Sequence, residues 1–139
     1  SPDDRTMYFA DTYRMQIRSF KFDADSGTLS KETLFAETRD RPGRPDGSTV
    51  DAEGFLWNAE YNGGRVVRYT PDGRIDRVID LPVALPTSCA FGGADLETLY
   101  VTSATQRLGP DDLAAQPDAG GVFAIRAGVS GLPEPEFFG

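Results

Sequence analysis

The chain has 139 residues and a formal net charge of −8, with 22 acidic residues, 14 basic residues and no histidine. This acidic balance argues against nucleic acid as a partner, because phosphate binding needs clustered lysine and arginine. Without histidine, the chain cannot build a Ser-His-Asp or Cys-His nucleophile, and any hydrolysis would use carboxylates, hydroxyls or an oxygen-ligated metal.

The remaining composition favours one domain, residues 1–139, made of short strands. Gly at 15 and Pro at 10 are high for this length and typical of strands joined by turns. No apolar run approaches the roughly 18 residues that span a bilayer, so we expect no membrane contact. Cys89 is the single cysteine, which fits a reducing compartment, and we expect a cytoplasmic protein.

The first segments to stand out along the chain share one pattern, an aromatic strand followed by a second apolar strand. The aromatic residues Tyr8, Trp57 and Tyr100 mark the three copies, which recur every 40–50 residues or so. Short strands at this period predict the blades of a β-propeller, and we expect the three aromatic side chains to pack between blades. The first unit begins at the turn Ser1–Asp4 and lacks its inner strand.

The second unit is the most complete. The Asn62-Gly63 pair predicts a tight reversal between its second and third strands. The predicted strands are Thr49–Asp51, Phe55–Tyr61, Arg65–Thr70 and Arg74–Leu81.

The third unit carries an insertion, Thr105–Gly120, between its second and third strands. Its Asp, Pro, Ala and Gly content predicts a loop, with one helical turn at Asp111–Gln116. The inner strand, Ser88–Phe91, is apolar, so Cys89 is expected to be buried and unreactive.

Two or three blades do not close a ring, because propellers typically have 4–8. We therefore expect an all-β chain that supplies about three C-terminal blades of a larger propeller, completed by an upstream segment, an upstream chain or a second copy. An antiparallel sandwich with coincidental spacing is the alternative fold.

The ordered motifs resemble the regucalcin/gluconolactonase family of six-bladed propellers. The resembling segments run from the first strand to the last. They are Tyr8–Thr12, Phe22-Asp23, Gly27–Ser30, Pro45–Gly47, Val50–Gly54, Trp57, Tyr61–Val66, Leu81–Val83, Pro86–Gly93, Leu99–Ala104 and Gln116–Phe123.

The resemblance implies hydrolysis of a sugar lactone at one divalent metal ion in the mouth of the propeller. Of the family's ligands, only the Asp of Pro-Asp-Gly maps onto this chain, as Asp46. Ca²⁺ suits oxygen ligands best, with Zn²⁺, Mg²⁺ or Mn²⁺ as alternatives, and the metal would activate water for attack on the cyclic ester. Asp46 is thus the predicted ligand and base; taken alone, it would be a turn aspartate.

Alternating strand directions place further polar residues on the face that carries Asp46. The predicted substrate-binding residues are Thr87, Ser88, Asp11 and Thr102. Thr87 and Ser88 could equally be hydroxyls satisfied where a strand begins, and Asp11 could cap a turn. Glu60 shares the face, and we interpret it as a solvent-exposed acid.

Three functional hypotheses remain open from the residues. The first is a metal-dependent lactonase, and the second is a non-catalytic binding or structural propeller fragment. In the third, two copies pair into one ring with two Asp46 side chains facing across its axis. A phosphotriesterase-like or purely calcium-linked activity also fits the same fold.

Overall fold

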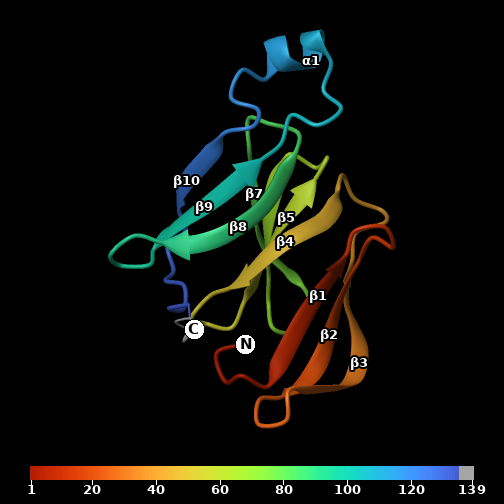
Figure 1. Cartoon of the computed structure of the whole chain (residues 1–139), viewed down its shortest axis with the longest axis vertical. Helices are drawn as coiled ribbons and strands as arrows, with labels where there is room; N and C mark the ends of the chain where they lie inside the picture. The colour runs from red at the N-terminus through yellow and green to blue at the C-terminus, as the bar shows by residue number, and fades with distance from the viewer. Residues whose placement is uncertain (135–139) are drawn as a thin grey trace.

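The computed structural model describes residues 1–134, which form three antiparallel sheets and one short helix (Figure 1). The first sheet comprises β1 (Thr6–Asp11), β2 (Gln16–Asp23) and β3 (Thr28–Glu37). The second comprises β4 (Arg44–Val50), β5 (Leu56–Tyr61), β6 (Arg65–Tyr69) and β7 (Ile75–Asp80). The third comprises β8 (Pro86–Gly92), β9 (Thr98–Ser103) and β10 (Val122–Arg126), and helix α1 (Pro110–Ala115) lies between β9 and β10.

The sheets confirm the predicted units and correct several of their boundaries, most of them by one residue. The first sheet has no strand before β1, as expected from the turn at Ser1–Asp4, and the predicted helical turn begins one residue earlier, at Pro110. The inner strand of the second unit begins at Arg44, not at Thr49. The turn-forming appearance of Pro45-Asp46-Gly47 hid this extension, because the register with β5 is irregular between Pro45 and Ser48.

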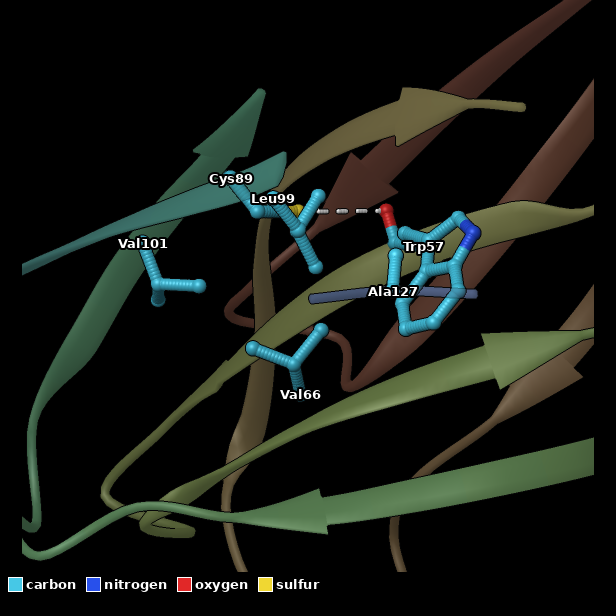
Figure 2. Close-up of a cluster of buried hydrophobic side chains, with 6 residues drawn as sticks. All are labelled: Trp57, Val66, Cys89, Leu99, Val101 and Ala127. Atoms are coloured by element: carbon cyan, nitrogen blue, oxygen red, sulfur yellow. Dashed lines mark hydrogen bonds between the residues drawn. The ribbon is translucent and has the colours of Figure 1, made fainter. Parts of the chain in front are cut away.

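The second sheet lies between the other two, so its central strand is covered on both faces (Figure 1). On one face Leu56, Val67 and Tyr69 pack against Ile17 of β2. On the other face Trp57 and Val66 pack against the third sheet (Figure 2). A strand covered on both faces loses the polar–apolar alternation, and Leu56 to Glu60 are all buried.

The third sheet contributes Cys89, Leu99 and Val101 to this core (Figure 2). The Cys89 thiol lies 3.6 Å from the carbonyl oxygen of Trp57, and burial raises the pKa of this thiol to about 12. Cys89 is therefore the buried, unreactive residue that the sequence predicts.

A buried cluster of charged side chains lies in the second sheet, just after the end of β4. Asp51 is fully buried and accepts hydrogen bonds from the Trp57 indole at 2.8 Å and the Arg68 guanidinium at 2.7 Å. Arg68 also reaches Glu53 and Asp76 and stacks on Phe55. The Val-Asp-Ala-Glu-Gly segment thus provides a satisfied charge network inside the blade.

Both ends of the described chain approach this turn. Gly131 pairs with Asp51 in an isolated bridge, and Pro2 lies beside Gly54. The start of β4, with Asp46, lies at the other end of the strand, on the side of the molecule that carries α1 (Figure 1). No helix within residues 1–134 has the length and apolar character needed to cross a bilayer.

Candidate functional site in the cleft around Asp46

Asp46 lies in a β-bulge near the start of β4. Pro45 pairs with Glu60 and Ser48 pairs with Asn58, so Asp46 and Gly47 together face a single residue of β5. The alternative interpretation of Asp46 as a turn aspartate is therefore wrong, because Asp46 lies within the inner strand. A bulge turns a side chain out of the regular alternation, which leaves Asp46 half-buried at the edge of the sheet.

Gly47 is required at the bulge because strand β8 approaches it closely. A Cβ atom at Gly47 would lie 2.2 Å from the Ser88 Oγ and 2.7 Å from the Ser88 Cα. A backbone atom at that distance cannot move aside as the tip of a long side chain can. The glycine of Pro-Asp-Gly thus serves close packing between two blades rather than an unusual backbone angle.

Two side chains hold the backbone of the bulge. Asn58 is fully buried, and its Nδ2 donates to the Asp46 carbonyl and to the Ser48 Oγ, both at 2.8 Å. Thr12 donates its hydroxyl to the Pro45 carbonyl at 2.8 Å. Peptide groups on both sides of the Asp46 side chain are therefore anchored by neighbouring strands and turns. Asn58 was missed as a supporting residue in the sequence, although its place two residues before Glu60 puts both on one face of β5.

Asp46 lines a cleft of about 440 Å³ between the three sheets. The first blade supplies one turn, the second supplies the start of β4 and the Tyr61–Gly64 turn, and the third supplies the loops that flank β8 and β9. The lining residues are Thr12, Tyr13, Arg44, Asp46, Tyr61, Asn62, Leu85 and Gln106–Leu108.

Burial raises the pKa of the Asp46 carboxyl group, and a hydrogen bond from the Gly47 backbone opposes this effect only partly. Loss of water is the dominant cause, because no arginine or lysine of the described chain lies within 4 Å of this carboxylate. A carboxylate left without a cationic partner in a cleft is a site where a bound cation would be favourable.

The donor types in the cleft fit a hard divalent cation. Asp46 offers carboxylate oxygens, and Asn62 and Tyr61 bring an amide and a hydroxyl oxygen to the same cleft. Within residues 1–134 no three His, Cys, Asp or Glu side chains gather as a metal cluster. The described lining of the cleft therefore offers one carboxylate, that of Asp46, to a cation.

The predicted substrate-binding residues lie outside the lining of this cleft. Asp11 accepts a hydrogen bond from the Arg14 backbone at 3.0 Å, which is the turn-capping geometry considered as its alternative. The Thr87 and Thr102 hydroxyls bond to each other at 2.8 Å, and Ser88 packs against Gly47.

Glu60 is completely buried, so its interpretation as a solvent-exposed acid is wrong. Its carboxylate accepts a hydrogen bond from the Arg65 Nε at 2.7 Å and another from the Tyr69 hydroxyl at 3.0 Å, while Arg41 lies 3.8 Å away. Burial, with Glu60 as the second cause, raises the pKa of Tyr69. The first blade covers this face of β5, and arginine partners compensate the buried charge.

The three sheets and the cleft between them define a partial β-propeller, and Asp46 is the one acid among the described residues that line this cleft. The chain belongs to the SMP-30/gluconolactonase/LRE-like family, whose model matches residues 1–105.

Individual relatives agree with this family. The chain is 41% identical over 139 residues to a 6-deoxy-6-sulfogluconolactonase of Pseudomonas putida, covering all of this chain and 48% of that protein. It is 40% identical over 141 residues to regucalcin of Oryctolagus cuniculus, covering 47% of it. A solved structure of the calcium-binding protein regucalcin from Agrobacterium tumefaciens superimposes with a TM-score of 0.92 at 38% identity, over 97% of this chain and 46% of that one.

The chain thus spans about half the length of the relatives that it matches. This ratio agrees with the expectation of a partial propeller of about three blades and is difficult to reconcile with a closed sandwich.

Proposed function

We propose that the complete protein hydrolyses a sugar lactone, with Asp46 as a ligand of a divalent cation and as the base. The observation that carries the proposal is the Asp46 carboxylate, which is turned into the cleft by the bulge and has its pKa raised by burial. Family membership and a lactonase among the relatives support the reaction class.

The residues in and around the cleft have separate roles in this reaction. Asp46, once ionised, can accept the proton of a water molecule that attacks the lactone carbonyl. Asn58 and Thr12 hold the backbone on which Asp46 is carried. Tyr61, Asn62 and Gln106 offer hydroxyl and amide groups suited to sugar hydroxyls. A bound divalent cation, with Ca²⁺ as the first candidate, would polarise the carbonyl of the ester.

The test replaces the carboxylate by its neutral isostere in the complete protein. Asp46→Asn should lower the affinity for the divalent ion and the kcat/KM for gluconolactone by about 100-fold or more, because a ligand and a proton acceptor are both lost. Metal binding is measured by calorimetry and hydrolysis by acid release. Asp25→Asn is the matched control, since Asp25 is exposed and lies far from the cleft. A variant at Asp46 with unchanged metal affinity and rate would contradict the proposal.

A non-catalytic calcium-binding or structural role is the second candidate. The single carboxylate in the cleft favours it, because the described residues do not complete a metal site on their own. This role would be supported if the complete protein binds a divalent cation but hydrolyses no lactone in the presence of Ca²⁺, Zn²⁺, Mg²⁺ or Mn²⁺.

A further inference from the structure

We propose that Arg44 and Arg107 form an anion-recognition pair in the cleft, and that the lactone hydrolysed there carries an anionic substituent such as a phosphate, sulfonate or carboxylate. The inference rests on the proposed function and deepens it, because it names the substrate class. It starts from the arrangement of charge: the chain is acidic overall, yet two of the three charged residues that line the cleft are arginines.

The two arginines differ from most others in the described part of the chain. Most arginines there have a carboxylate within 4 Å, Arg65 and Arg68 among them. Two further arginines have no such carboxylate: Arg77 donates to a backbone carbonyl instead, and Arg5 lies outside the cleft. Arg44 and Arg107 are exposed and have neither a carboxylate nor a side-chain hydrogen-bond partner within residues 1–134. Their guanidinium donors are therefore available to a ligand.

Each arginine stands on an anchored piece of backbone. Arg44 precedes Pro45 in β4 and pairs with Tyr61 of the neighbouring strand β5. Arg107 lies in the insertion after β9, at a positive φ of 68°. Leu108 N donates to the Thr105 carbonyl at 3.1 Å in the turn around it.

The insertion is anchored on both sides of Arg107. Just before it, Ala104 N donates to the Leu85 carbonyl at 2.9 Å. At its other end, Gly120 N donates to the Ser103 Oγ at 3.1 Å, and Ala84 N donates to the Gln116 Oε1 at 2.6 Å. Arg107 lines the cleft from this anchored segment.

Charge screening decides which charges a ligand experiences in the cleft. At physiological salt the Debye length is about 8 Å, so exposed acids elsewhere on the molecule act weakly there. Among the described residues that line the cleft Asp46 is the single acid, and its charge is the one that a bound cation would neutralise. Two unpaired guanidinium groups then dominate the local field, and guanidinium groups match the oxygens of phosphate, sulfonate and carboxylate.

The test compares neutral and anionic lactones on the complete protein. The probes are glucono-1,5-lactone, 6-phosphogluconolactone and 6-deoxy-6-sulfogluconolactone. We expect the wild-type protein to prefer at least one anionic lactone by about tenfold or more in kcat/KM, because charge-assisted hydrogen bonds discriminate on this scale. The two anionic probes distinguish a phosphate from a sulfonate as the preferred group.

Substitutions assign the preference to the two residues. Arg44→Gln and Arg107→Gln should each reduce the anionic-to-neutral ratio by about fivefold or more. Arg44→Lys should retain part of the ratio, because the positive charge remains while the planar guanidinium group is lost. Arg74→Gln is the matched control, since Arg74 is an exposed arginine on the β6–β7 turn, outside the cleft, and should leave the ratio unchanged. Equal rates on neutral and anionic lactones, or an unaltered ratio in both glutamine variants, would overturn the inference.

A binding experiment separates this inference from the proposed function. If no lactone is hydrolysed, the proposed function fails, and calorimetry with 6-phosphogluconate and gluconate still tests the arginine pair. Tighter binding of 6-phosphogluconate that is lost in Arg44→Gln and Arg107→Gln supports anion recognition without catalysis. Indistinguishable binding of the two acids rejects it.

Discussion

The Asp46 carboxylate illustrates how one residue connects folding to ligand binding. Its folded-state pKa is raised by burial, so ionisation is less favourable in the folded protein than in the unfolded chain. Stability from this group is fully present below the ordinary pKa of 3.8 and is lost as pH rises through the raised value. Placing this carboxylate in the cleft therefore lowers the stability of the fold at neutral pH.

Melting temperatures measured over a series of pH values test this effect of Asp46 on stability. In the presence of a chelator, Asp46→Asn should melt at a higher temperature than the wild type at about pH 8, because asparagine carries no charge to desolvate. The two melting temperatures should converge as pH approaches the ordinary aspartate value. Thermal denaturation by circular dichroism measures the difference, and a variant that is less stable than the wild type at the higher pH would contradict the assignment.

At the scale of the element, strand β4 depends on its contact with β8. The bulge exists because Gly47 allows the Ser88 backbone to approach, and Asn58 completes the hydrogen bonding of the widened strand. Packing and hydrogen bonding thus act on one short segment, and Asp46 takes its orientation from both.

Gly47→Ala should therefore cost about 2–3 kcal/mol of unfolding free energy, because overpacking forces two strands apart. The same variant should bind the divalent ion more weakly, since the bulge that carries Asp46 moves. Urea unfolding and calorimetry give the two readouts. Gly109→Ala is the matched control, because its Cβ would meet nothing closer than 3.7 Å, and it should cost only about 0.5 kcal/mol.

At the scale of the whole molecule, the first and third sheets each have one uncovered face. Met7 and Phe9 of β1 point away from the second sheet, and Leu34 lies on the same face. On the third sheet, Tyr100 and Val122 share the uncovered face. Exposed apolar sheet faces of this kind favour association with another chain or another segment.

Native mass spectrometry of the isolated 139-residue chain tests this directly, with metal content read from the same spectrum. We expect self-association, or a complex with a chain that covers the two faces, and one divalent ion per completed ring. Phe9→Lys should weaken the association because it places a charge on the apolar face, whereas Tyr13→Lys, in an exposed turn, should not. A strictly monomeric, metal-free chain would exclude pairing and leave the catalytic proposal to a longer protein.

Local patterns were sufficient to predict the three blades, the loop after β9 with its helical turn and the burial of Cys89. These features depend on turn residues, strand alternation and spacing, all of which are written along the chain. The burial of Glu60 escaped prediction because the strand that carries it is covered on a face where alternation predicts solvent.

The sequence by itself therefore determined which strands form and in which order they follow one another. The tertiary structure alone decided that Asp46 lies in a bulge, that Asn58 supports it, and that Arg44 and Arg107 meet in one cleft. The physical reason is that a bulge and a cleft arise from how separate blades approach each other. Such approaches depend on close packing between residues that are distant in the chain, which no local pattern records.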